Sequence, residues 1–212
     1  METVLVQGAT GNIGVSAVTA ALRSKRNVLA VARDQSSADK LVKYIGSSKG
    51  ITFAEANVLS DSGVKGIVDR VREGKLPPFQ HVFSCDHHHR TSTFPLKLTS
   101  RDTTAYMLEQ KNPARTWMIC TASQGDLATH PVPAMTQGAL FPMTTAAAHE
   151  NESTSVRSNE IYLEFRVEAD ELAVQHGVTK SSDFRNVYEL ILANSEVRIS
   201  RFRSDIMRKV MQ

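Results

Sequence analysis

Three glycines near the N-terminus have the spacing of a phosphate-binding turn. Gly8, Gly11 and Gly14 follow the apolar run Thr3–Gln7 and lead into a helical stretch that continues to Arg23. In this context Gly8 permits a tight turn, Gly11 lets the backbone approach a pyrophosphate, and Gly14 lets the helix pack closely on the strand. The amide groups at the start of the helix then face the phosphates. The pattern favours a dinucleotide site, and the alternative is a turn that serves packing alone.

Residues after the next two predicted strands indicate which dinucleotide would bind. An acidic residue at Ala32 would bind the ribose hydroxyls of NAD, whereas the guanidinium of Arg33 suits the 2′-phosphate of NADP. The alternative for Arg33 is a solvated residue that starts a loop. Asn57 could accept a hydrogen bond from the adenine amino group, or it could be a turn residue. We therefore predict NADP as the cofactor, with contacts from Gly8, Thr10, Gly11, Asn12, Ile13, Gly14, Arg33, Asn57, Val58, Ser84 and Cys85.

A run of titratable residues follows the fourth predicted strand. Asp86 precedes His87, His88 and His89, and the end of that strand lies at the mouth of the expected crevice. Histidine titrates near neutral pH, so one of the three could be a general acid or base. A metal site is a second option, but neighbouring side chains on extended backbone point apart, so no metal is predicted. A polar surface loop is the third interpretation.

The elements that must position these residues alternate along the chain. Apolar runs predict strands over residues 3–7, 27–32, 51–56, 81–85, 117–121, 156–163 and 196–202. Helices are expected up to residue 23 and over residues 38–45, 61–73, 103–110, 134–150 and 182–194, with Ser36 and Gly46 capping the second and Pro142 starting or kinking the fifth. Such alternation predicts an α/β fold, a single doubly wound Rossmann-like domain over residues 1–212 with a parallel sheet of about seven strands.

Composition excludes several classes of protein. The 212 residues carry a net charge of +3, too small a surplus to argue for nucleic acid, and the arginine-rich stretch 198–208 is expected to be a solvated strand edge. No apolar run approaches the roughly 18 residues of a membrane span, and no secretory signal is visible, so no membrane partner is expected. Two cysteines, Cys85 and Cys120, cannot build a disulfide framework, which favours the cytoplasm. Both are expected to be buried on neighbouring strands.

By these features the chain resembles the short-chain dehydrogenase/reductase family over nearly its whole length. The resemblance implies hydride transfer with a Tyr-x-x-x-Lys pair on a long helix and a serine after the fifth strand. Ser123 matches the serine, with Thr121 second. Met135 and Ala139 stand where the tyrosine and lysine are expected, and neither side chain can move a proton. Similar proteins are frequent in fungi, often in secondary metabolism.

Two further stretches depart from the family pattern. Tyr162 and Arg166 have the spacing of a tyrosine and a replaced lysine, but the segment 151–163 matches the family's passage into its sixth strand. Tyr162 is therefore expected at the end of that strand and Arg166 at the start of the substrate-side connection, and both could still line the pocket. The helix before the fifth strand, which supplies a catalytic Asn and half of the usual dimer face in the family, is expected to be reduced to residues 103–110, with no Asn that can be matched.

Two functions from different classes follow. The first is an NADP-binding oxidoreductase of atypical mechanism that acts on a small carbonyl or imine compound, with Ser123 orienting the substrate and His87, His88 or Tyr162 handling the proton. The second is a non-redox isomerase, cyclase or dehydratase of the same fold, or an inactive nucleotide-binding protein. Loss of the tyrosine and lysine favours the second, and retention of the glycines and Arg33 favours nucleotide binding. The expected partner is a small-molecule substrate, and a homodimer is an option.

Overall fold

Seven parallel strands form the central sheet of the chain. The computed structural model describes residues 1–85, 94–110, 112–113, 115–198 and 201–211, and for residues 94–98 the backbone alone. The strands of the sheet are β1 (Thr3–Gln7), β2 (Asn27–Ala32), β3 (Ile51–Glu55), β4 (His81–Ser84), β5 (Arg115–Ala122), β6 (Val156–Leu163) and β9 (Arg201–Phe202). Their order is β3-β2-β1-β4-β5-β6-β9, and every pairing is parallel. The predicted doubly wound α/β fold is confirmed.

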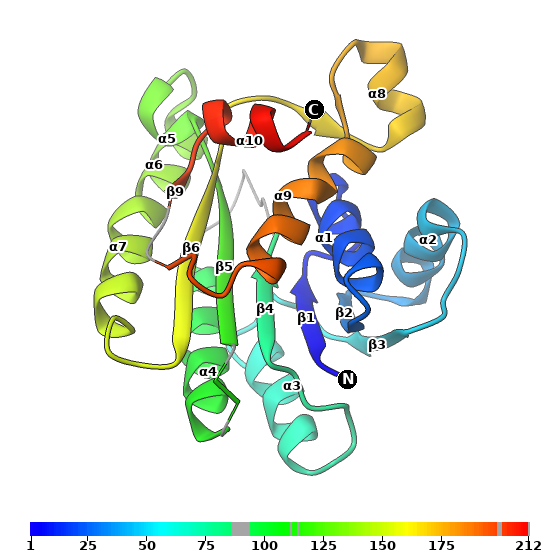
Figure 1. The fold of residues 1–212 in the computed structure, drawn as a ribbon, viewed down its shortest axis with the longest axis vertical. Coiled ribbons are helices and arrows are strands. Elements are labelled where there is room, and N and C mark those ends of the chain that lie inside the picture. Colours follow the sequence, from blue (N-terminus) through cyan, green and yellow to red (C-terminus); the bar gives the residue numbers. More distant parts are fainter. Residues whose placement is uncertain (86–93, 111, 114, 199–200, 212) are drawn as a thin grey trace.

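Helices cover both faces of this sheet (Figure 1). They are α1 (Asn12–Arg23), α2 (Gln35–Ile45), α3 (Gly63–Arg72), α4 (Phe94–Glu109), α5 (Gln124–Leu127), α6 (Pro131–Gly138), α7 (Leu140–Glu150), α8 (Asp170–His176), α9 (Ser181–Ala193) and α10 (Ser204–Met211). One core joins α1, α2, α9 and α10 to the sheet, and the other joins α3, α4 and α7 to it. Alternate β1 residues face opposite cores, Val4 and Val6 one and Leu5 the other, as a strand buried on both faces requires.

Two helices differ from their predicted extents because polar residues shape them. The expected helix 103–110 is the second half of α4, which begins at Phe94. Thr99, Thr103 and Met107 are buried at four-residue spacing, and the Thr103 hydroxyl donates to the Thr99 carbonyl at 2.6 Å. A search for apolar periodicity leaves threonine out, so the sequence did not predict that this face of the helix is buried. The expected cap of α2, Ser36, is also wrong, since the Asp34 carboxylate accepts from the Ser37 amide at 2.8 Å.

The long helix expected over residues 134–150 is divided into α6 and α7. The break falls at Gly138 and Ala139, and Pro142 lies in the first turn of α7, where its missing N–H costs no helical hydrogen bond. Gly138 also lies against Gly125 of α5, where a Cβ on Gly125 would come within 2.7 Å of the Gly138 nitrogen. The close approach of α5 and α6 thus depends on glycine.

The C-terminal region also departs from the expected long strand. Within the described residues after 194, only Arg201–Phe202 pairs with β6, and the chain then forms α10. The Glu164 carboxylate caps α10 by accepting from the Ser204 amide at 3.1 Å, and Met207 is fully buried. A separate two-stranded parallel ribbon, β7 (Val167–Glu168) and β8 (Thr179–Lys180), flanks α8 and was not predicted.

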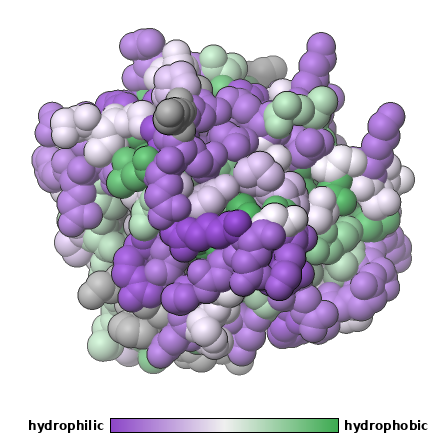
Figure 2. Space-filling view, turned by 90° about the horizontal axis from the view of Figure 1, so that it is seen from below, coloured by the Kyte–Doolittle hydropathy of each residue, from purple (hydrophilic) through white to green (hydrophobic). Residues whose placement is uncertain are grey.

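Two further features concern the surface of the molecule and the length of its helices. Figure 2 shows the face at the amino ends of the strands, which is covered mainly by hydrophilic residues. Among the helices of the described residues, none is long and apolar enough to cross a membrane.

Candidate functional site

A cavity of about 840 Å³ lies at the carboxyl ends of the strands. Its lining comes from the segments that follow β1, β2, β3, β4, β5 and β6. The lining residues are Gly8, Thr10, Gly11, Asn12, Ile13, Val31, Ala32, Arg33, Ser37, Ala56, Asn57, Val58, Leu59, Cys85, Ala122, Ser123, Gln124, Leu127, Leu163, Glu164, Phe165, Arg166, Val167 and Glu168. The order of the strands reverses between β1 and β4, and ligands of open α/β sheets bind at such a crevice.

The glycine turn has the geometry that its spacing predicts. Gly8 has a φ of +70°, which side chains rarely adopt, and its carbonyl accepts from the Gly11 amide at 3.1 Å. A Cβ on Gly14 would lie 2.1 Å from the Gly8 carbonyl oxygen, so glycine is required for α1 to approach β1. A Cβ on Gly11 would meet nothing closer than 3.5 Å. Gly14 does not line the cavity, so its role is packing.

The N-terminus of α1 is open toward an anion. No side chain caps it, and its first turn contains no acidic residue. Thr10, Gly11, Asn12 and Ile13 all line the cavity at this point. The first amide groups of a helix have no partner within the helix and carry its partial positive charge. The residues present therefore fit the diphosphate of a dinucleotide.

Arg33 and Ser37 form the rim at the end of β2. The Arg33 side chain is 79% exposed and pairs with the Asp34 carboxylate at 3.3 Å. Asp34 is held from its other side by the Ser36 hydroxyl and the Ser37 amide, and these bonds, with Arg33, hold its pKa far below the usual range. Ser37 was not predicted; the signal that could have found it is a hydroxyl in the first turn of the helix after Arg33.

The segment after β3 has a turn that occupies the side chain of Asn57. Its Oδ1 accepts from the Leu59 amide at 3.0 Å, which supports the turn interpretation rather than an adenine contact. Asn57 and Val58 still line the cavity. A Cβ on Gly63 would come within 2.1 Å of the Asn57 carbonyl, so this turn also depends on close backbone packing.

Ser123 is held at the cavity by the elements around it. Its amide donates to the Leu163 carbonyl at 2.9 Å, and its carbonyl accepts from the Asp126 and Leu127 amides of α5. The neighbouring Ala122 amide donates at 3.0 Å to the buried side chain of Gln137, which reaches over from α6. The Ser123 hydroxyl has no hydrogen-bond partner among the residues that the structure describes, so it can bind a substrate oxygen or nitrogen. Thr121, the second candidate, is buried, and its hydroxyl donates to Glu160 at 2.5 Å.

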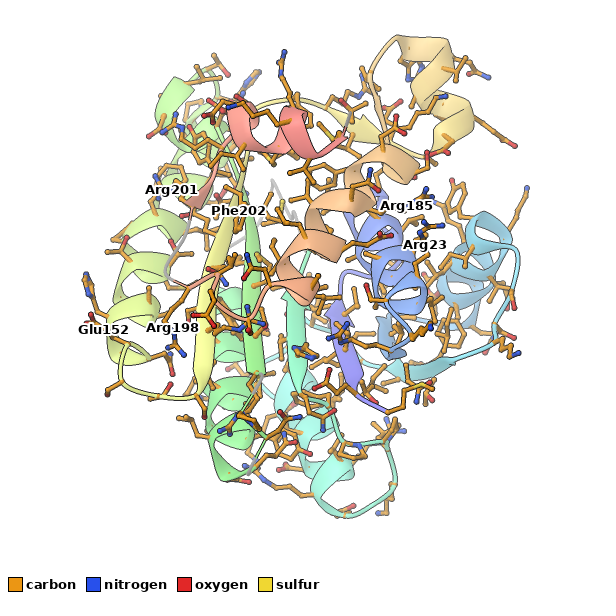
Figure 3. The ribbon with its side chains drawn as sticks, in the orientation of Figure 1. Arg23, Glu152, Arg185, Arg198, Arg201 and Phe202 are labelled. Carbon is orange, nitrogen blue, oxygen red and sulfur yellow. The ribbon has the colours of Figure 1, made fainter. Side chains whose placement is uncertain are left out.

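Tyr162 lies outside the cavity lining. Its ring packs against Phe141 and beneath the guanidinium groups of Arg201 and Arg203, and its hydroxyl donates to the Asp126 carboxylate. Figure 3 labels Arg201 on β9, at the edge of the sheet. Burial and the bond to Asp126 raise the pKa of Tyr162 to about 12. This placement indicates that Tyr162 positions α5, because its bond to Asp126 joins β6 to the helix that follows Ser123.

Met135 and Ala139 do not reach the cavity. The Met135 side chain is 75% exposed, and Ala139 is exposed between α6 and α7. Among the described residues that line the cavity, there is no tyrosine and no lysine. The assignment of Met135 and Ala139 to the positions of the family's pair stays a prediction.

The end of β4 contributes one of the two residues expected there. Cys85 lines the cavity and contacts the Tyr188 hydroxyl at 3.3 Å, whereas Ser84 is buried beneath it with its hydroxyl toward Gln7. Cys85 and Cys120 are buried at the neighbouring strands β4 and β5, as expected. Asp86 and His87, His88 and His89 lie outside the described residues.

Of the charged residues after β6, sequence reasoning named Arg166 as a residue that could line the pocket, and it missed Glu164 and Glu168. Glu164, Arg166 and Glu168 line the cavity, and so does Phe165. Hydrogen bonds from the amide and side chain of Ser204 and the nearby Arg203 hold the pKa of Glu164 below its usual value, so it is an ionised helix cap. Charged residues are common in loops, so their types alone do not indicate a site. The return of the chain over the sheet brings these three into the cavity that the glycine turn also lines.

Comparisons with known proteins agree with this geometry. No family model matches the chain. A curated relative, the short-chain dehydrogenase/reductase iacG of Pestalotiopsis fici (strain W106-1 / CGMCC3.15140), is 46% identical over 224 residues, which cover 94% of this chain and 90% of the relative.

Solved structures share the fold at low sequence identity. A short-chain dehydrogenase/reductase of Brucella melitensis has a TM-score of 0.70 at 16% identity, covering 95% of this chain and 93% of its own. An NADPH-bound short-chain oxidoreductase of Pseudomonas aeruginosa PAO1, described as containing an atypical catalytic centre, has a TM-score of 0.74 at 14% identity, covering 95% and 94%. From its identity to the curated relative over nearly the whole length, the chain belongs to the short-chain dehydrogenase/reductase family.

Proposed function

We propose that the protein is an NADP-dependent oxidoreductase that acts on a small carbonyl or imine compound without the family's tyrosine and lysine. The observation that carries the proposal is one cavity that joins the glycine turn, the Arg33 guanidinium and the Ser123 hydroxyl. When bound, the nicotinamide supplies or accepts a hydride. In the Pseudomonas neighbour the same fold holds NADPH and contains an atypical catalytic centre, which supports the combination.

The N-terminal half of the cavity would hold the nucleotide. The first amides of α1 would donate to the diphosphate, and Arg33 would pair with the 2′-phosphate. Asp34 keeps its bonds to Ser36 and Ser37 when Arg33 turns away, so the ion pair at rest is easily exchanged. Ser37 would add a hydroxyl donor on the same rim.

The other half of the cavity would hold the substrate. Leu127, Leu163 and Phe165 give it an apolar lining, which favours a small and largely apolar compound. The Ser123 hydroxyl would donate to the reacting oxygen or nitrogen and fix its distance from the nucleotide. We further propose a role in secondary metabolism, which rests on the resemblance of the sequence to fungal members of the family.

The proton that accompanies the hydride needs a separate group. We retain His87 and His88 as the proposed general acid or base, because in the sequence they closely follow Cys85, which lines the cavity, and histidine titrates near neutral pH. Tyr162 is assigned the positioning of α5 instead. Replacing His87, His88 and His89 together by alanine should remove most activity and leave NADPH affinity nearly unchanged. Full activity of that variant would make the histidines a surface loop.

Calorimetric titration with NADPH and NADH tests the cofactor. We expect NADPH to bind tenfold or more tightly than NADH, as a charge-assisted pair of about 1.5 kcal/mol implies, and Arg33→Ala to remove the preference. Arg23→Ala is the matched control, since Arg23 lies at the far end of α1 beside α9 and pairs with Glu189 at 2.8 Å (Figure 3). Equal affinities for the two nucleotides in the unaltered protein would refute the NADP assignment.

Turnover distinguishes an oxidoreductase from a protein that only binds the nucleotide. NADPH absorbance should fall when a panel of small ketones, aldehydes and imines is added, and Ser123→Ala should lower kcat at unchanged NADPH affinity. If bound NADPH is never consumed while a compound of the panel is isomerised, cyclised or dehydrated, the redox proposal is wrong.

A further inference from the structure

Arg166 is a second cation on the cavity, opposite in the fold to Arg33. It follows β6, lines the cavity, and has a side chain that is 64% exposed. Its guanidinium forms an ion pair with the Glu168 carboxylate, which is nearly buried. The second oxygen of Glu168 accepts from His176 of α8 at 2.6 Å. These bonds and the charge of Arg166 keep the pKa of Glu168 below its ordinary value, so the carboxylate stays ionised at neutral pH.

The backbone around Arg166 is fixed against the start of α1. The Arg166 carbonyl accepts from the Thr179 amide at 3.2 Å, which ties the segment to β8. The next residue, Val167, is buried in the core that includes Ile13 of α1. Figure 1 shows the chain after β6 passing over the upper end of α1 on its way to α8. The open N-terminus of α1 and Arg166 therefore line the same cavity.

From this arrangement we propose that Arg166 binds the diphosphate of the dinucleotide together with the first amides of α1. The inference rests on the proposed function and deepens it, because it adds a cationic side chain to the amides of α1 as a binding group for the diphosphate. The diphosphate carries two negative charges, whereas the first turn of α1 offers amide groups and no cationic side chain. A guanidinium binds phosphate oxygens in pairs of hydrogen bonds, which a second anchor at this point requires.

The ion pair with Glu168 makes this exchange feasible. When Arg166 turns toward phosphate, Glu168 keeps its hydrogen bond to His176 and is not left as an unpaired buried charge. Arg33 shows the same arrangement at the other end of the cavity, since Asp34 keeps its serine partners. Each arginine is thus held close to its proposed phosphate by a carboxylate that has other donors.

Three nucleotides separate the roles of the two arginines. NADPH carries both the diphosphate and the 2′-phosphate, whereas NADH and ADP-ribose carry the diphosphate without the 2′-phosphate. Calorimetric titration of Arg166→Ala with each should show a loss of about tenfold or more, by a similar factor for all three. Arg33→Ala should lower the affinity for NADPH alone. Arg23→Ala, which removes a cation far from the cavity, should change the affinity for none of the three nucleotides. Arg166→Lys should recover part of the loss.

The other outcomes are equally defined. Unchanged affinity of Arg166→Ala for all three nucleotides overturns the inference and leaves the proposed function standing, and a raised KM for the substrate in that variant would assign Arg166 to an anionic substrate. A loss confined to NADPH would assign it to the 2′-phosphate and would also overturn it. If the unaltered protein binds none of the nucleotides, the proposed function itself fails.

Discussion

Gly14 makes the sharpest prediction, because its replacement must move a helix. In Gly14→Ala the new Cβ would lie 2.1 Å from the Gly8 carbonyl oxygen and 2.7 Å from the Ala9 backbone. These are backbone atoms at a turn whose shape Gly8 fixes, so α1 must retreat from β1 by on the order of 1 Å. Overpacking of this kind costs about 1–3 kcal/mol, and rigid neighbours place the cost near the upper limit. In a domain of this size the melting temperature should fall by about 6–12 °C.

Two other glycines are matched controls for this variant. Gly11→Ala adds a methyl group that meets nothing closer than 3.5 Å, on backbone that alanine adopts readily, so its stability should change by less than about 0.5 kcal/mol. Gly66→Ala, in the middle of α3 with open space around it, should stabilise the fold by up to about 1 kcal/mol.

The same variants separate folding from binding. Gly11→Ala places its methyl group where the diphosphate would approach the amides, so NADPH binding should be lost while the melting temperature is kept. Gly14→Ala should lose both. Differential scanning calorimetry and NADPH titration on the three variants provide the measurements. A Gly14→Ala protein with the same melting temperature as the unaltered chain would refute the close approach of α1 and β1 on which the site is built.

Three further predictions concern residues outside the glycine turn. His81, whose pKa is lowered by burial, hydrogen-bonds Glu2 at 3.1 Å and, with other partners, lowers the pKa of Glu2 from 4.5 to about 2. Both folded-state pKa values lie below their unfolded-state values. The contribution of Glu2 to the free energy of unfolding is therefore present above pH 4.5 and is lost as the pH falls toward 2. Below pH about 6.5, protonation of His81 in the unfolded chain also lowers the free energy of unfolding. Glu2→Gln should therefore cost about 1–2 kcal/mol at pH 7, after allowance for partial exposure, and urea unfolding should show this difference shrinking between pH 5 and pH 3; a constant difference would contradict the linkage. Tyr162→Phe should lower stability by about 1 kcal/mol and reduce activity without abolishing it, since the hydroxyl holds Asp126 of α5; complete loss of activity with intact nucleotide binding would make Tyr162 catalytic. Met135→Phe, at a side chain that is 75% exposed, should leave stability within about 0.5 kcal/mol and turnover unchanged, and a large fall in kcat would place Met135 at the substrate.

Local sequence determined the N-terminal half of the fold. The bounds of β1 and β2 coincide with the predicted strands at 3–7 and 27–32, because strands buried on both faces are continuous in hydrophobicity. The turn at Gly8 and the cap at Gly46 follow from positive φ angles, which glycine adopts at little cost. Residue type and spacing alone are sufficient where the constraint acts within a few residues.

Tertiary structure decided the parts in which distant residues meet. The full length of α4 depends on threonines buried against other elements, and α10 begins where Glu164, forty residues earlier, caps the Ser204 amide. Tyr162 was expected near the ligand, yet its ring is enclosed by Phe141, Arg201 and Arg203. Arg166 lines the cavity because the chain after β6 returns over the sheet and Val167 of β7 packs in the same core as α1. A sequence pattern records which residues are neighbours along the chain, whereas burial and ion pairing depend on which residues are neighbours in space, and those are set by the packing of the whole sheet.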